Sequence, residues 1–113
     1  MRAFILLSLV SISENIFAHD YHFKGAYVWG AEVDAFRSCG SKEAYWVSHG
    51  WGSININLTE YYRKNTIKPY QELYIEFRGH YHQEESDGFA AEYAGIVHIS
   101  EVFSVSNVLP PDC

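Results

Sequence analysis

The stretch FKGAYVWGAEVDAFRSCGSKEAYWV, residues 23–47, decides the fold of this chain. It holds two runs typical of β-strands, a glycine-containing bend and Cys39, one of only two cysteines in the sequence. The other cysteine is the last residue, Cys113. We interpret the stretch as the start of a β-barrel that a bridge between the two cysteines closes.

Length and composition limit the chain to a single folded domain. Its 113 residues are 48% hydrophobic and 17% aromatic. Disordered chains are poor in aromatic residues, so we expect this one to fold, and its aromatic side chains favour strands over helices. The formal net charge of −6 argues against binding to nucleic acid or to an anionic membrane surface, because basic side chains drive both.

Residues 1–18, MRAFILLSLVSISENIFA, have the pattern of a secretory signal peptide. Arg2 supplies the positive charge, and residues 3–12 form an apolar run that is too short to span a bilayer. We expect cleavage after Ala18, which leaves residues 19–113 as one soluble domain in the periplasm or outside the cell. The alternative is a buried, uncleaved N-terminal helix. No cysteine directly follows the apolar run, so we expect no lipid anchor in the mature chain.

Hydrophobic alternation, glycines and turn residues divide the mature chain into five strands and one helix. The expected strands cover residues 26–29, 32–36, 44–47, 73–81 and 96–105. Asn57 caps the helix, which ends near Asn65 because Pro69 prevents its continuation. Three strands, one helix and two strands suit the five-stranded Greek-key barrel called the OB-fold, but the spacing alone also fits another small β-barrel. The expected fold class is all-β with one short helix.

The same alternation predicts which side chains fill the barrel. The inward face of the strand at residues 73–81 is expected to carry Leu73, Ile75, Phe77 and Tyr81. The inward face of the last strand is expected to carry Val97, Ile99, Phe103 and Val105. On the helix, one face is expected to hold Leu58, Tyr61 and Tyr62. We expect sharp bends at Gly25 and Gly30, which flank the first strand.

Several features lie in an order that is similar to a known family. They are Gly25-Ala26-Tyr27, Phe36 three residues before Cys39, Leu58 and Tyr62 on the helix, Pro69 ahead of a strand with Leu73 and Gly79, and a closing Cys113. In this order the chain resembles the C-terminal OB-like domain of NlpE, the bacterial outer-membrane lipoproteins of copper resistance and envelope stress.

The resemblance implies a role in the bacterial envelope. NlpE proteins also carry an N-terminal domain with a Cys-x-x-Cys motif and a lipidated cysteine, and this chain shows neither. The resemblance therefore implies a free-standing, soluble relative of the second domain. In NlpE that domain holds a terminal disulfide tied to redox sensing and to signalling at the inner membrane.

The two cysteines allow only one intramolecular pairing, Cys39 with Cys113. An exported protein resides where disulfides form and persist, so we expect this bridge rather than two free thiols.

Two of the six histidines have a spacing typical of a metal site. His80 and His82 lie on one face of an expected strand, about 7 Å apart along the chain. With a third ligand they can bind Zn or Cu. Candidate third ligands nearby in the sequence are Glu84, Glu85 and Asp87. The alternative is that these histidines are solvated polar side chains.

A second metal hypothesis concerns the new N-terminus that cleavage would create. His19 would then supply a free amine and an imidazole, which together chelate copper, and His22 lies close enough in the sequence to help. Catalysis has less support. Two groups of carboxylates could pair for acid–base chemistry, Glu32 with Asp34 and Glu84 with Glu85 and Asp87. The sequence contains no nucleophile elbow, phosphate-binding loop or zinc-protease helix to support a site around them.

The sequence therefore predicts an exported, non-enzymatic envelope protein with no cofactor other than a possible Cu or Zn ion. Following the resemblance, we expect it to act by protein contacts in envelope stress or metal homeostasis. The alternative is a metal- or small-ligand-binding module that uses His80 and His82. The sequence does not identify the protein partner or the ligand.

Overall fold

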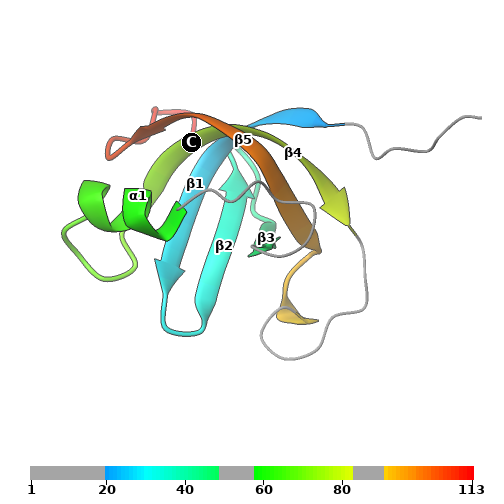
Figure 1. Ribbon diagram of the computed structural model, residues 1–113, viewed down its shortest axis with the longest axis horizontal. Helices are drawn as coiled ribbons and strands as arrows, with labels where there is room; N and C mark the ends of the chain where they lie inside the picture. Colours follow the sequence, from blue (N-terminus) through cyan, green and yellow to red (C-terminus); the bar gives the residue numbers. More distant parts are fainter. Residues whose placement is uncertain (1–19, 49–57, 83–90) are drawn as a thin grey trace, which may run out of the picture.

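The computed structural model of the chain describes residues 20–48, 58–82 and 91–113 (Figure 1). The expected signal peptide, the helix cap Asn57, and the candidate ligands His19, Glu84, Glu85 and Asp87 lie outside these residues. The elements in order are β1 Tyr21–Gly30, β2 Val33–Ser38, β3 Ala44–Ser48, α1 Leu58–Asn65, β4 Leu73–His82 and β5 Ile96–Ser106.

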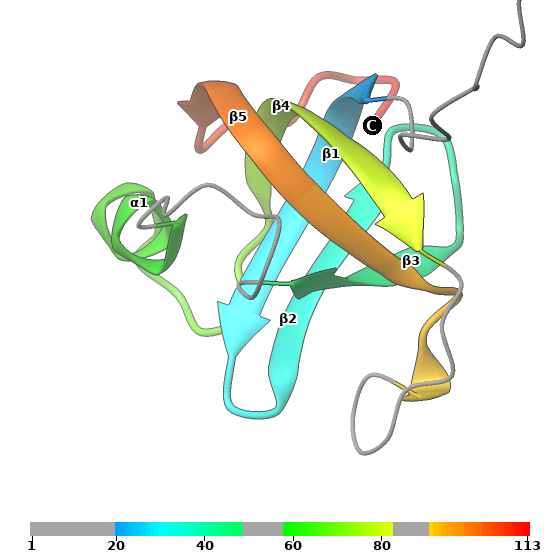
Figure 2. The same cartoon turned by 45° about the vertical axis from the view of Figure 1, so that its right-hand side comes forward.

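The five strands form one closed barrel in the order β1-β2-β3-β5-β4 (Figure 2). The pairs β1–β2, β2–β3, β1–β4 and β4–β5 are antiparallel, whereas β3 and β5 are parallel. The helix lies between β3 and β4 in the chain. This is the arrangement of an OB-fold, and it confirms the fold class expected from the sequence.

β1 is the strand that the sequence described least well. The expected strand at residues 26–29 was too short, because β1 begins at Tyr21. Its first part pairs with β4, from Tyr21 opposite Gly79 to Tyr27 opposite Leu73, and its last part pairs with β2. The residues before position 26 therefore extend the barrel, although polar side chains dominate them.

Gly25 is required for close packing rather than for the sharp bend that we expected. It lies inside β1, where a Cβ atom would come within 2.8 Å of the Phe36 ring. Any larger side chain would push β1 away from β2.

The barrel interior is filled by aromatic and branched side chains, most of which are almost completely buried. They are Phe23, Tyr27, Phe36, Val47, Leu58, Tyr62, Leu73, Ile75, Phe77, Val97 and Ile99. Rings of Phe23, Phe36 and Phe77 contact one another at centroid distances of 4.7–5.9 Å. Burial on this scale stabilises the fold by about 25 cal/mol per Å² of apolar surface.

The inward faces of β4 and β5 differ from the expected ones near their middle. The pairing register of β5 against β4 shifts twice, between Glu76 and Phe77 and between Arg78 and Gly79. Each shift inserts an extra residue into β5 and moves the next side chain to the opposite face. Phe103 is therefore 49% exposed, and Val102 packs against the core instead.

Two tyrosines expected in the core are also partly outside it. Tyr81 is 39% exposed, although its ring contacts Phe23 and Tyr45 at 4.9 and 4.5 Å. Tyr61 is 46% exposed, because only Leu58 and Tyr62 of α1 turn toward the barrel. A helix of eight residues has room for a narrow buried stripe, and Tyr61 lies beside it.

The disulfide between Cys39 and Cys113 joins residues 74 positions apart. Cys39 follows β2, and its backbone N–H donates a hydrogen bond to the carbonyl of Lys24 in β1. The Cys113 N–H donates to the carbonyl of Pro110, which folds the tail into a turn. The bridge thus holds the C-terminal tail beside the open end of the β1–β2 hairpin, where β2 ends.

We predict that substituting Cys113 with Ser lowers the thermal midpoint by at least several degrees. A bridge across a loop of this length restricts the unfolded chain by an amount equivalent to about 4 kcal/mol, which is a large part of a small domain's net stability. Thermal unfolding of the oxidised protein and of the variant measures the change. Cys39→Ser should give the same loss, and an unchanged midpoint in both variants would contradict the prediction.

Candidate metal centre

The side chains of Asp20, His80 and His98 form a row on the outside of the barrel. In β4, Leu73, Ile75 and Phe77 point inward, so alternation turns His80 outward. His80 lies directly opposite His98 of β5. On the other side of β4, Asp20 precedes Tyr21, which pairs with Gly79, so Asp20 lies beside His80.

His82 completes a cluster of three imidazoles with His80 and His98, because it lies two residues beyond His80 on the same face of β4. The ring centroids of the three residues are 4.5–5.1 Å apart. One nitrogen from each ring lies within 4.8 Å of the others. The structure thus brings together the two histidines that the sequence selected and adds a third.

His98 is a candidate ligand that the sequence reasoning missed. A signal for it existed, since Val97 and Ile99 face the core and alternation turns His98 outward. What the sequence did not show was the register that sets His98 opposite His80.

Asp20 holds the His80 ring in place. Nδ1 of His80 lies 3.0 Å from an Asp20 carboxylate oxygen, and Arg78 contacts the second oxygen at 3.2 Å. Burial raises the pKa of Asp20, but hydrogen bonds from His80 and Ser100 and the charge of Arg78 outweigh it, so the pKa lies below its usual value. An ionised Asp20 can only accept a hydrogen bond, so in the neutral imidazole that suits a metal the Nδ1–H of His80 donates to Asp20 and the lone pair on Nε2 is left for a ligand.

The cluster has the composition and the size of a transition-metal site. Neutral imidazole suits Zn, Cu, Ni and Fe. In a tetrahedral zinc site with bonds of about 2.0–2.1 Å, ligand nitrogens lie about 3.4 Å apart. The three nitrogens are within 4.8 Å of one another, so the rings would have to turn toward a common point to bind an ion with that separation. Three protein ligands also leave one coordination position for water or for another ligand.

His22, one of the two histidines of the N-terminal metal hypothesis, lies beside other side chains than the cluster. Nε2 of His22 lies 3.5 Å from Glu76, and its ring lies 5.1 Å from that of Phe103. His22 is therefore not part of the three-histidine cluster. His19, the other residue of that hypothesis, is outside the described residues.

The two carboxylates of the proposed pair, Glu32 and Asp34, lie in different surroundings. Asp34 is only 8% exposed and accepts a hydrogen bond of 2.6 Å from the Tyr27 hydroxyl. Burial, together with the charge of Asp34, raises the pKa of Tyr27. Glu32 lies in the exposed turn between β1 and β2. Asp34 thus satisfies a buried hydroxyl, which is a structural role.

The fold and the cluster define the chain as a small OB-fold domain with histidines grouped on its outer surface. A family model described as the NlpE C-terminal OB domain matches residues 18–99. This is most of the chain, so the chain belongs to the NlpE C-terminal OB domain family, as the resemblance in its sequence indicated. No curated protein and no solved structure matches it. Among the residues described, there is no helix of the length and apolarity needed to cross a membrane.

We predict that Asp20→Asn weakens Zn(II) binding about 10- to 100-fold, because losing a carboxylate that orients a ligand histidine typically has this effect. Calorimetric titration of both proteins measures the change. Glu76→Gln is the matched control, since Glu76 contacts His22 and Lys24 instead of the cluster. Equal affinities in Asp20→Asn and the wild type would show that Asp20 does not support the site.

Proposed function

We propose that this domain is an exported, non-catalytic member of its family that binds one divalent transition-metal ion and acts in envelope metal homeostasis. The observation that supports the proposal is the cluster of His80, His82 and His98, with ligand nitrogens within 4.8 Å of one another. Its place on the outer face of β4 and β5 makes the ion accessible from solvent.

The arrangement is better explained by metal binding than by solvation alone. Solvation alone gives no reason for three imidazoles from two strands to converge, yet their ring centroids lie 4.5–5.1 Å apart. Asp20 is a carboxylate that contacts the cluster through His80. A bound cation would give each ring a ligand bond.

The donor set favours Zn(II) or Cu(II). Three imidazoles with an additional position form the ligand set of known zinc sites, and imidazole affinity for divalent ions is highest at copper. The free coordination position can accept a side chain from another envelope protein. Metal binding and protein contact would then be parts of one function.

Export is the second component of the proposal. The disulfide between Cys39 and Cys113 supports it, because such bonds persist outside the cytoplasm. The family is also one of envelope proteins. We therefore place the mature domain, residues 19–113, in the periplasm or outside the cell.

Protein contact without metal is the second candidate function. It is favoured by two apolar side chains near the end of the chain, Phe103 at 49% and Val108 at 70% exposure. If the function is protein contact without metal, adding Zn(II) or Cu(II) leaves the thermal midpoint unchanged. Under the metal-binding proposal, the bound ion raises the thermal midpoint.

We predict one Zn(II) or Cu(II) ion per chain and a loss of that binding in His98→Ala. At an ion concentration 100-fold above Kd, binding stabilises the fold by about 2.7 kcal/mol, which thermal unfolding detects. Calorimetry gives the stoichiometry and the affinity. Every protein tested should have its N-terminal amine acetylated, which prevents chelation by that amine together with His19.

His22→Ala is the matched control, because His22 lies on the same barrel surface but outside the cluster. It should bind metal like the wild type. Undiminished binding by His98→Ala, or by the His80→Ala and His82→Ala double variant, would reject the site.

A further inference from the structure

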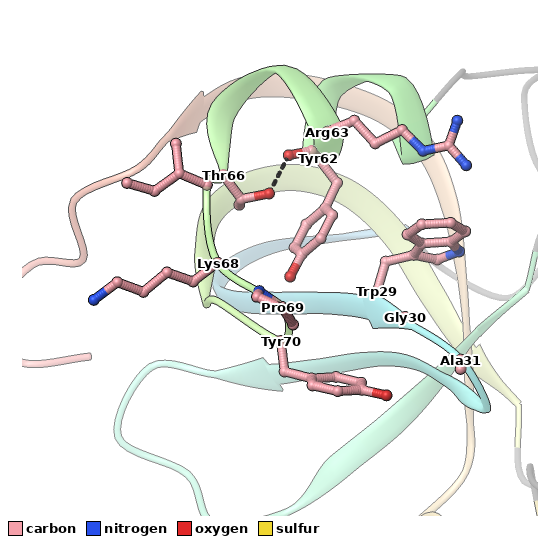
Figure 3. Close-up of a pocket in the computed structure, with 10 residues that line it drawn as sticks. Trp29, Gly30, Ala31, Tyr62, Arg63, Thr66, Lys68, Pro69 and Tyr70 are labelled. Carbon is pink, nitrogen blue, oxygen red and sulfur yellow. Dashed lines mark hydrogen bonds between the residues drawn. The ribbon is translucent and has the colours of Figure 1, made fainter.

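A cavity of about 400 Å³ lies between α1, the end of β1 and the segment that leads into β4 (Figure 3). Its lining residues are Trp29, Gly30, Ala31, Tyr62, Arg63, Thr66, Ile67, Lys68, Pro69 and Tyr70. In Figures 1 and 2, α1 and the C-terminal end of β4 are on opposite sides of the barrel. The cavity is therefore a separate site from the histidine cluster.

Two of the cavity's aromatic walls are held firmly. The Tyr62 ring is 6.3 Å from Trp29 and 5.7 Å from the buried ring of Tyr27. The Tyr62 hydroxyl donates a 2.7 Å hydrogen bond to the carbonyl of Gln71. Small-ligand sites are usually preformed in this way and have volumes of about 300–1,000 Å³.

Tyr70 forms a third wall at the cost of an unfavourable backbone conformation. Its φ of 58° is in the left-handed region, which a bulky residue rarely adopts. This backbone aims the ring over Gly30, where a Cβ atom would come within 2.6 Å of it. Strained residues that persist are concentrated at ligand sites and switch regions.

The segment that carries Tyr70 is well ordered by its own hydrogen bonds. The side-chain oxygen of Gln71 accepts hydrogen bonds from the backbone N–H groups of Ile67 and Lys68, at 2.9 and 3.2 Å. The Gln71 N–H donates to the carbonyl of Lys68. Tyr70 is thus presented by a rigid turn.

The charge at the cavity differs from that of the chain. The chain has 14 acidic and 8 basic residues, yet the described residues of the lining include Arg63 and Lys68 and no carboxylate. The Arg63 guanidinium lies 4.9 Å from the Trp29 ring centroid, at the rim. Figure 3 shows the Lys68 side chain extending away from the other lining residues and the Arg63 guanidinium beside the Trp29 ring, so Arg63 is the cation nearer to a ligand that stacks on Trp29.

We propose that this cavity binds a small anionic ligand with a flat aromatic body. The rings of Trp29 and Tyr70 provide apolar surfaces for stacking, the buried Tyr62 closes the wall behind them, and Arg63 pairs with a carboxylate or sulfonate at the rim. This activity is independent of metal binding at the cluster.

The test uses 8-anilinonaphthalene-1-sulfonate, a fluorescent aromatic anion, with uncharged N-phenyl-1-naphthylamine as the comparison. The native mature protein, residues 19–113, should bind one molecule of the sulfonate probe per chain. Arg63→Ala should weaken the sulfonate at least tenfold and affect the uncharged probe much less. Lys24→Ala removes a cation outside the cavity and should change neither affinity.

The Tyr70→Gly variant tests whether the cavity can lose its affinity for the probes while the fold keeps its stability. Glycine adopts a positive φ without strain, so this variant should keep its thermal midpoint while its affinity for both probes falls at least tenfold. Tyr21→Ala is the control, because Tyr21 is 57% exposed and not part of the cavity lining. The proposal is overturned if no sulfonate probe binds, or if Arg63→Ala and Tyr70→Gly bind it like the wild type.

Discussion

The close pairing of β4 with β1 on one side and β5 on the other is the constraint on which the rest of the structure depends. At Gly79, an added Cβ atom would lie 3.2 Å from the backbone carbon of His98 and 3.1 Å from the Phe77 ring. No other residue type allows the strands to approach so closely. The extra residues in β5 turn Val102 inward and leave Phe103 exposed as the strand pairs with β4. The same close pairing sets His98 opposite His80, so one strand junction both closes the core and positions the candidate metal ligands.

The two candidate sites use this rigid barrel in different ways. The histidine cluster depends on strand register alone, since its ligands lie on β4 and β5 and its supporting carboxylate, Asp20, lies beside β1. The cavity depends on the short helix and on the strained turn at Tyr70. The histidine cluster lies outside the barrel interior, and the cavity shares Tyr62 with the aromatic core. A domain of this size can therefore carry two surface sites without loss of its core.

The sequence was sufficient for features that depend on local patterns. Alternation identified β4 and its core residues Leu73, Ile75 and Phe77, and the element order indicated the OB-fold. Features that are set by long-range strand pairing could not be predicted from the sequence. Phe103 was assigned to the core because alternation has no means of detecting the two register shifts in β5. His98 and Asp20 were missed for the same reason, because they are 18 and 60 residues from His80 in the chain and meet it only through strand pairing.

The most direct test of the metal-binding account is an NMR spectrum of the histidine ring nitrogens, recorded on ¹⁵N-labelled protein with and without one equivalent of Zn(II). If β4 and β5 hold the ion together, the ring signals of His80, His82 and His98 shift at the same Zn(II) concentration, while those of His22 do not change. The opposite result, in which His98 is unaffected or His22 shifts with the ion, would contradict a metal site built across this strand junction.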